Sequence, residues 1–305
     1  MGDDLPVSAP AIERSLSEAM GRPVSITDLT RLHGGMTGST VVRARLASFS
    51  HDIVIKIAAD PDTVAREAAV LRWLGTNTQF PVPGVLAEHA GDFGLLAIEL
   101  LRGVNLGEAR LLGGDFRKCE REMAEALAGL HEHTRPEFGE LVGGQRFATW
   151  AEAFAEMLGD FEDDVTRGRL DEAAMRRVRG IVEALPQIIP DRLPARLVHG
   201  DVWATNVIVR REGHEWRLSG FVDLPAARFA DTEFELAYLL VFNTVGRDFF
   251  ERYADFHEID SGYAFRRLVY HLHTMLVHVW LFGDEHYRAS ARDFAARIAA
   301  ELGID

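Results

Sequence analysis

The chain has little cysteine, no long apolar runs and little positive charge, and each shortage excludes a class of protein. Its single cysteine, Cys119, excludes an internal disulfide and any cysteine-rich metal site. No apolar run is long enough to cross a bilayer. The first ten residues also lack the basic segment and apolar stretch of a secretory signal. The sequence therefore predicts a cytoplasmic protein with no membrane contact.

Negative charge outweighs positive charge, because the chain has 33 lysines and arginines and 47 aspartates and glutamates, which gives a net charge of -14. A general nucleic-acid-binding protein needs a basic surface, so we expect no nucleic-acid partner. An acidic cleft can attract a cationic ligand, but excess negative charge can also simply keep a protein soluble. With 305 residues, 47% of them hydrophobic, the chain has enough apolar material for one large domain or two small ones.

The first third of the chain has the pattern of an antiparallel sheet with one helix. Apolar and polar residues alternate, or form short apolar runs, between glycine-rich and proline-rich turns. Pro61 suits the first turn of a helix and Gly75 suits its end. The expected strands are residues 24–32, 40–46, 53–57, a short stretch near 85, and 94–101.

After Gly103 the pattern becomes mostly helical, with one stranded interlude at residues 197–223 and a hairpin turn at Glu212–Gly213. Three helices are expected after it. The chain therefore predicts an α+β architecture with two lobes and a ligand site between them. Residues 1–102 form the expected nucleotide-binding lobe. Residues 103–305 form the expected helical lobe, with the catalytic loop and the acceptor pocket.

The strongest chemical signal is the segment His199-Gly200-Asp201, followed by Asn206 and an apolar strand. An aspartate on such a loop can accept a hydrogen bond from an incoming hydroxyl, and an asparagine five residues on can reach a phosphate-bound metal. Asp223, at the end of the next apolar strand, can hold a divalent ion. His199 is expected to orient the loop by hydrogen bonding. The other histidines, His131 among them, lack metal-site spacing and are expected to be packing or pocket residues.

A fixed positive charge is the remaining requirement for phosphoryl transfer. Lys56 stands alone inside the apolar strand at residues 53–57, so it must reach a wet cleft or pair with an acid. Glu67, on the following helix, is the expected partner. This arrangement copies the strand-lysine and helix-glutamate ion pair of protein kinases.

Together these motifs resemble the aminoglycoside phosphotransferase family. That family is a branch of the protein-kinase-like fold that also includes choline, homoserine and fructosamine kinases. The resemblance covers residues 24–300 and implies ATP and Mg²⁺ as cofactors. It implies Asp201 as the catalytic residue and Asn206 and Asp223 as metal ligands. The chain departs from the family pattern at Ala230 and Glu235, where glycine and aspartate are usual. We expect these positions to brace the catalytic loop.

Two further segments resemble nucleotide-binding parts of the family. The glycine-rich turn at residues 33–39 would bring backbone amides near the phosphates of ATP through Gly34, Gly35 and Gly38. Such a hairpin is also often only a turn. The link from Glu99 to Leu101 lies where kinase-like proteins hydrogen-bond adenine, and an edge strand without a ligand is the alternative.

The acceptor is less well defined. The acidic segment at residues 152–164 would suit an aminoglycoside or another cationic antibiotic, although a solvated helix face is the more common reason for such a segment. The form Asp201-Val202-Trp203 and the segments 262–270 and 280–283 resemble fructosamine kinases instead. The predicted function is ATP-dependent phosphorylation of a small-molecule hydroxyl, with a cationic antibiotic as the expected acceptor and a role in resistance. A fructosamine-kinase-like or other metabolite kinase is the alternative, and a non-catalytic nucleotide-binding protein is the second.

Overall fold

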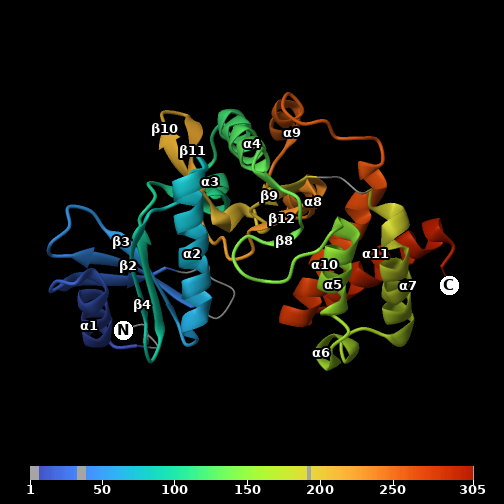
Figure 1. Cartoon of the computed structure of the whole chain (residues 1–305). Helices are drawn as coiled ribbons and strands as arrows, with labels where there is room; N and C mark the ends of the chain where they lie inside the picture. Colours follow the sequence, from blue (N-terminus) through green and yellow to red (C-terminus); the bar gives the residue numbers. More distant parts are fainter. Residues whose placement is uncertain (1–6, 33–38, 191–193, 305) are drawn as a thin grey trace. The chain divides into compact units, whose positions relative to one another are not determined.

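The computed structural model describes residues 7–32, 39–190 and 194–304 and confirms the predicted α+β class (Figure 1). The chain forms two compact units. The first comprises Met1–Gly129 and Ala204–Ala226, and the second comprises Leu130–Trp203 and Ala227–Asp305. The lobe boundary expected after residue 102 stays a prediction.

The main sheet of the first unit is antiparallel, with strand order β1-β2-β3-β5-β4. All five expected strands are present in the structure. Their bounds are β1 (Ile26–Arg31), β2 (Ser39–Leu46), β3 (Ile53–Ala58), β4 (Val85–Ala90) and β5 (Gly94–Glu99).

Side chains on β3 alternate between the two faces of this sheet. Ile53, Ile55 and Ile57 join an apolar cluster that includes Ile12 and Leu16 of α1 (Ala9–Met20). The residues between them point to the opposite face, where α2 (Pro61–Asn77) packs near β3, β4 and β5. The sheet is therefore buried on both faces, and this explains the nearly continuous apolar run of β3.

The helix bounds correct two expectations. Helix α1 was missed, although Ser8 at its N-cap and Pro10 in its first turn are start signals. Helix α2 begins as predicted, with Pro61 in its first turn and the Asp60 carboxylate accepting from the N–H of Asp62 at 3.1 Å. It passes through Gly75 and ends where the Thr78 hydroxyl donates to the carbonyl of Leu74 at 2.8 Å.

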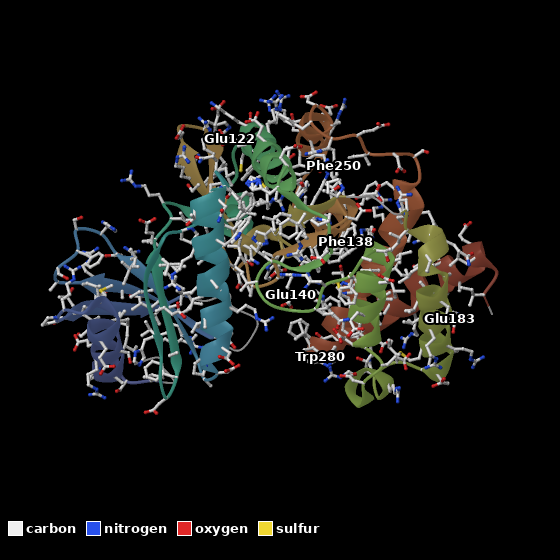
Figure 2. All side chains as sticks on the ribbon, viewed as in Figure 1. Glu122, Phe138, Glu140, Glu183, Phe250 and Trp280 are labelled. Atoms are coloured by element: carbon white, nitrogen blue, oxygen red, sulfur yellow. The ribbon has the colours of Figure 1, made fainter. Side chains whose placement is uncertain are left out.

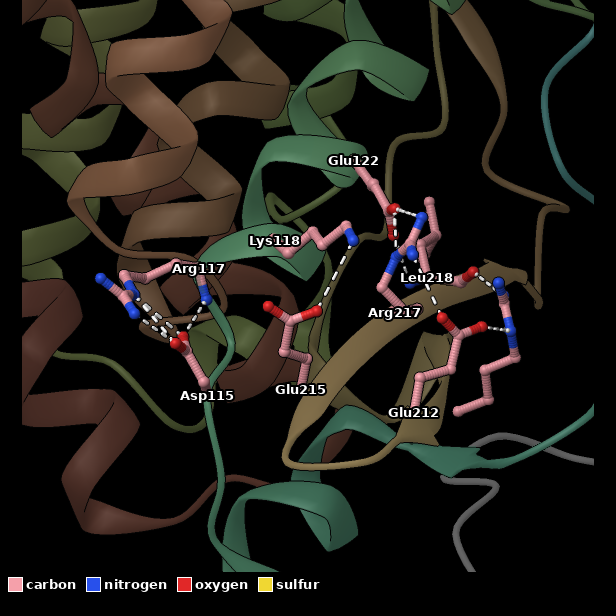
Figure 3. A network of polar contacts seen from close by, with 9 residues as sticks. Asp115, Arg117, Lys118, Glu122, Glu212, Glu215, Arg217 and Leu218 are labelled. Atoms are coloured by element: carbon pink, nitrogen blue, oxygen red, sulfur yellow. Dashed lines mark hydrogen bonds and ion pairs between the residues drawn. The ribbon is translucent and has the colours of Figure 1, made fainter.

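A second, three-stranded sheet in this unit has the order β11-β10-β6. The predicted hairpin is the pair β10 (Val207–Glu212) and β11 (Glu215–Phe221), and β6 (Val104–Asn105) leads into α3 (Leu106–Leu112). Arg217 on the hairpin pairs with Glu122 of α4 (Arg117–His131), and Glu122 also accepts from the N–H of Leu218 at 2.8 Å (Figure 3). These contacts fix the hairpin against α4.

The second unit contains a four-stranded sheet with order β7-β9-β12-β8, surrounded by helices. Its strands are β7 (Thr134–Arg135), β8 (Gly139–Glu140), β9 (Ala195–Val198) and β12 (Arg228–Ala230). Its helices are α5 (Trp150–Gly159), α6 (Asp164–Arg167), α7 (Glu172–Ile188), α8 (Thr232–Val241), α9 (Arg247–Tyr253), α10 (Tyr263–Leu281) and α11 (Glu285–Leu302). Four helices thus follow β12, where three were expected.

Aromatic side chains fill the core of the second unit. Phe138, labelled in Figure 2, is fully buried with its ring centroid 5.9 Å from that of Trp150. Trp150 contacts Phe154 and Phe234 at 5.6 Å each, and its indole N–H donates to the Tyr270 hydroxyl at 3.2 Å. This core holds α5, α8 and α10 together. Among the described helices, none combines the length and apolarity that a membrane span requires.

Candidate active site

In the first unit, Lys56 forms the ion pair that the sequence predicts. Its Nζ is 2.6 Å from Oε1 of Glu67 and 3.1 Å from Oδ1 of Asp223. The residue is 8% exposed, so the ammonium does not point into bulk solvent. The predicted ion pair is therefore present, and it also includes the carboxylate expected to bind metal.

Electrostatics keep this lysine charged. Burial disfavours an ammonium, but the carboxylates of Glu67 and Asp223 outweigh it and raise the pKa of Lys56 above its ordinary value. The side chain of Asp223 is 40% exposed, whereas that of Glu67 is 6% exposed. Glu67 therefore anchors the lysine from within the unit, and Asp223 presents an accessible oxygen beside it.

The hairpin β10–β11 brings Asn206 close to Asp223. Val207 pairs with Phe221 in register, and the N–H of Val222 donates to the carbonyl of Asn206 at 2.9 Å. Asp223 follows with a φ of 64°, a left-handed conformation that is uncommon outside glycine but that aspartate tolerates. Such outliers cluster at functional sites. Both predicted metal ligands thus lie at one end of one hairpin.

The other predicted nucleotide contacts stay predictions. Gly34, Gly35 and Gly38 lie outside the described residues. Glu99 ends β5, and its N–H donates to the carbonyl of Gly84 at 2.9 Å. Any contact of this link with adenine would therefore use other backbone groups, such as those of the half-buried Leu101.

In the second unit, the predicted catalytic loop follows β9. Gly200 has a φ of 85°, which explains a glycine at this turn. The N–H of Asp201 donates to Nδ1 of His199 at 3.2 Å, as expected of a histidine that orients the loop. The N–H of Trp203 donates to the carbonyl of Asp201 at 3.1 Å. These bonds give the loop a defined shape around Asp201.

A buried chain of hydrogen bonds braces this loop from α8. Glu235 accepts from the N–H of Gly200 at 2.8 Å, and its other carboxylate oxygen is 2.9 Å from Nε2 of His131. His131 Nδ1 is in turn 2.7 Å from the hydroxyl of Tyr253. Burial opposes ionisation, yet the bonds from His131 and Gly200 lower the pKa of Glu235. Glu235 therefore braces the loop although aspartate is usual there, and His131 belongs to the bracing.

Sequence reasoning missed Tyr238. Its hydroxyl donates to Oδ1 of Asp201, and the residue lies on α8 three positions after Glu235. The only signal in the sequence was that spacing, since residues three apart share one helix face.

Half-buried aromatic rings continue from Tyr238 across the second unit. Its ring meets that of Phe242 edge-on, with the ring centroids 5.4 Å apart. The centroid of Phe242 lies 6.4 Å from that of Trp203 and 5.1 Å from that of His278. Tyr287 stands 4.7 Å from His278. A series of aromatic contacts therefore leads from Tyr238, the residue bonded to Asp201, through this unit.

Three residues of the acidic segment, by contrast, are engaged in local structure. Glu152 forms a capping box with Thr149 at the start of α5. Glu162 pairs with Arg167 at 3.0 Å. Asp163 accepts from the indole N–H of Trp280, labelled in Figure 2, at 2.7 Å. These contacts favour a structural role for the segment over a polycation pocket.

Comparison with known proteins identifies the family. The sequence model described as fructosamine kinase matches residues 8–301. The chain belongs to the fructosamine kinase family. It is accordingly a phosphotransferase that acts on a small-molecule hydroxyl, and the fructosamine alternative fits it better than the antibiotic-kinase prediction does.

Curated relatives agree with this family. A ketoamine kinase homologue from Enterococcus faecium is 27% identical over 55% of the chain, and that match spans 63% of the relative, slightly under two thirds of its length. A homologue from Synechocystis is 26% identical over 92% of the chain and 94% of the relative.

Solved structures show the same kinase-like fold. A fructosamine-3-kinase homologue from Haemophilus somnus has a TM-score of 0.73 at 19% identity and covers 94% of this chain and 96% of that one. The aminoglycoside phosphotransferase APH(4)-Ia has a TM-score of 0.69 at 19% identity and covers 96% and 99%. The predicted protein-kinase-like fold is therefore confirmed.

Proposed function

We propose that this protein transfers the γ-phosphate of ATP to a hydroxyl of a ketoamine, the adduct formed when a sugar condenses with an amine and rearranges. The observation that carries the proposal is the fructosamine kinase pattern over residues 8–301. ATP as donor is supported by a fold relative, since APH(4)-Ia has been crystallised as a ternary complex with AMP-PNP and hygromycin B.

Lys56 would hold the donor phosphates. Its ammonium is kept charged and oriented by Glu67, so its position costs no rearrangement when ATP binds. Asp223 is the exposed carboxylate at this lysine, and we propose that it and Asn206 hold Mg²⁺. Both residues suit Mg²⁺, because each has a side-chain oxygen and both lie at one end of the β10–β11 hairpin. When bound, Mg²⁺ would neutralise phosphate charge.

Asp201 would act on the acceptor. An alcohol is a poor nucleophile and the transition state of phosphoryl transfer is loose, so placement of the hydroxyl matters more than basicity. The carboxylate orients the acceptor O–H and takes its proton late. The oxygen–phosphorus bond forms as the bond from the γ-phosphorus to the β–γ bridging oxygen breaks, and ADP leaves.

The surroundings of Asp201 support a ketoamine over a polycationic antibiotic. Aromatic faces suit the apolar faces of a sugar and attract the single ammonium of a ketoamine. Trp203, Phe242 and Tyr287 provide such rings in the same unit as Asp201. Three carboxylates of the acidic segment, those of Glu152, Glu162 and Asp163, are bound to neighbouring side chains or backbone, which weakens the case for a polycation pocket there.

The test is acceptor-dependent ADP release with a panel of compounds. The panel contains ketoamines of acetyl-lysine made from sugars of different length, the unglycated acetyl-lysine, free fructose and hygromycin B. The proposal expects turnover with at least one ketoamine and background rates with its unglycated amine. Turnover confined to hygromycin B would instead support the antibiotic-kinase function.

A further inference from the structure

Tyr238 makes a contact that family membership does not explain. Its hydroxyl donates a hydrogen bond to Oδ1 of Asp201. Three residues earlier on α8, Glu235 accepts from the N–H of Gly200 at 2.8 Å. One helix face thus holds the catalytic loop twice, once by its backbone and once by its carboxylate.

The direction of this bond follows from chemistry. A phenol remains protonated near neutral pH, since its ordinary pKa is about 10, and an ionised carboxylate can only accept. The ring is also held in place, because it is half-buried and meets Phe242 edge-on at 5.4 Å. The hydroxyl is therefore a fixed donor to the catalytic carboxylate.

We propose that Tyr238 is a positioning residue that fixes the orientation of the Asp201 carboxylate. With Oδ1 bonded to the phenol, the carboxylate is held in one orientation relative to the loop that carries it. Because the bond favours the ionised carboxylate, it also keeps the proton acceptor ready at lower pH. This inference rests on the proposed function, in which Asp201 orients the acceptor and receives its proton.

The decisive variant is Tyr238→Phe, which removes one oxygen and keeps the ring. Hydrogen bonds to charged groups are strong enough that we expect kcat to fall roughly tenfold or more. KM for ATP should stay within about twofold of the wild-type value. The acidic limb of the pH–rate profile should move to higher pH. If Tyr238 contributed only the packing of its ring, the substitution would change neither kcat nor the pH–rate profile.

The matched control is Tyr263→Phe. The Tyr263 hydroxyl is buried on α10 and has no hydrogen-bond partner among the described residues. Its removal should leave kcat and the pH profile unchanged. Melting temperatures of both variants separate loss of folding from loss of positioning. The aliphatic variant Tyr238→Leu, compared with Tyr238→Phe, separates the contribution of the ring from that of the hydroxyl.

Two assays keep this inference distinct from the proposed function. One measures ketoamine phosphorylation, and the other measures ATP hydrolysis with water as the acceptor. An inactive wild type in the first assay overturns the ketoamine proposal, while the second still tests Tyr238. If Tyr238→Phe matches the wild type in kcat and pH profile in whichever assay shows turnover, the positioning role is wrong.

Discussion

At the scale of single residues, the ion pair of Lys56 is the feature that the sequence predicts most directly. A lone lysine inside an apolar strand must either reach a wet cleft or pair with an acid, and the second option required a carboxylate nearby. Glu67 was the predicted partner and lies 2.6 Å away. The contact with Asp223 could not be predicted, because it depends on how the β10–β11 hairpin folds back on the same unit.

This chain offers an unusually clean test of Lys56. It contains two lysines, Lys56 and Lys118, and Lys118 makes an exposed ion pair with Glu215 at 3.5 Å (Figure 3). A reactive acyl-phosphate analogue of ATP acylates lysines that touch its phosphates. We expect mass spectrometry to find the label on Lys56, with protection by unmodified ATP.

The control is built into the same experiment, because Lys118 should be labelled only at a background level that ATP does not change. Equal labelling of both lysines, or labelling of Lys56 that ATP does not reduce, would contradict the nucleotide role. The measurement needs no acceptor, so it tests the donor side of the reaction by itself.

At the scale of elements, helix α8 supports the catalytic loop through Glu235. The variant Glu235→Gln keeps an oxygen for the N–H of Gly200 but replaces the carboxylate beside His131. Since the group is fully buried, we expect a loss of about 1–3 kcal/mol in the free energy of unfolding and a lower kcat. Urea denaturation and steady-state kinetics on the same samples measure the two effects.

The surface variant Glu183→Gln provides the comparison. Glu183 is exposed on α7 and labelled in Figure 2, and the substitution should change stability by less than about 0.5 kcal/mol. If Glu235→Gln unfolds at the same urea concentration as Glu183→Gln and keeps its activity, the buried chain to His131 does not brace the loop.

Helix α10 makes stability depend on pH. Burial lowers the pKa of His273 to about 3 and that of His271 to about 4, both below the ordinary 6.5. As pH falls through 6.5, the unfolded chain takes up these protons before the folded chain does. The contribution of these neutral histidines to the free energy of unfolding is therefore fully present above pH 6.5. It is lost as pH falls toward 3, by up to about 1.4 kcal/mol per pH unit for each histidine.

The variant His273→Phe should weaken this dependence. Its ring would stay among the rings of Phe154, Phe161 and Phe234, with no proton to gain. We expect its melting temperature to fall less steeply than that of the wild type between pH 6.5 and 4.5. The exposed His286→Gln is the control and should keep the wild-type slope. Parallel slopes for all three proteins would argue against a buried neutral His273.

Elements differ in how well their sequences predicted them. The strands of the main sheet carry period-two or continuous apolar patterns over six to eight residues, and all five were found. Strands β7 and β8 have two residues each, too few for any periodic signal, and they exist because β9 and β12 supply their hydrogen bonds. Tyr238 was missed for a related reason, since a tyrosine on an apolar helix has no local feature that distinguishes packing from a bond to Asp201.

At the scale of the whole molecule, the reaction class was predictable and the acceptor was not. The order and spacing of Lys56, Asp201 and Asp223 carry the chemistry of phosphoryl transfer, which is common to antibiotic and metabolite kinases. The choice between acceptors depends on which side chains surround Asp201. The acidic segment favoured a polycation in the sequence, but Glu162 and Asp163 within it are bound to neighbours in the fold.

The most direct test of the account is phosphorylation of a ketoamine by the wild type and by Asp201→Asn. The variant keeps the size of the side chain but removes the proton acceptor. We predict that ³¹P NMR detects a phosphorylated ketoamine with the wild type, and that kcat falls at least roughly a hundredfold in the variant while ATP affinity is retained. Equal turnover by both proteins, or no ketoamine product with active wild-type enzyme, would contradict the account.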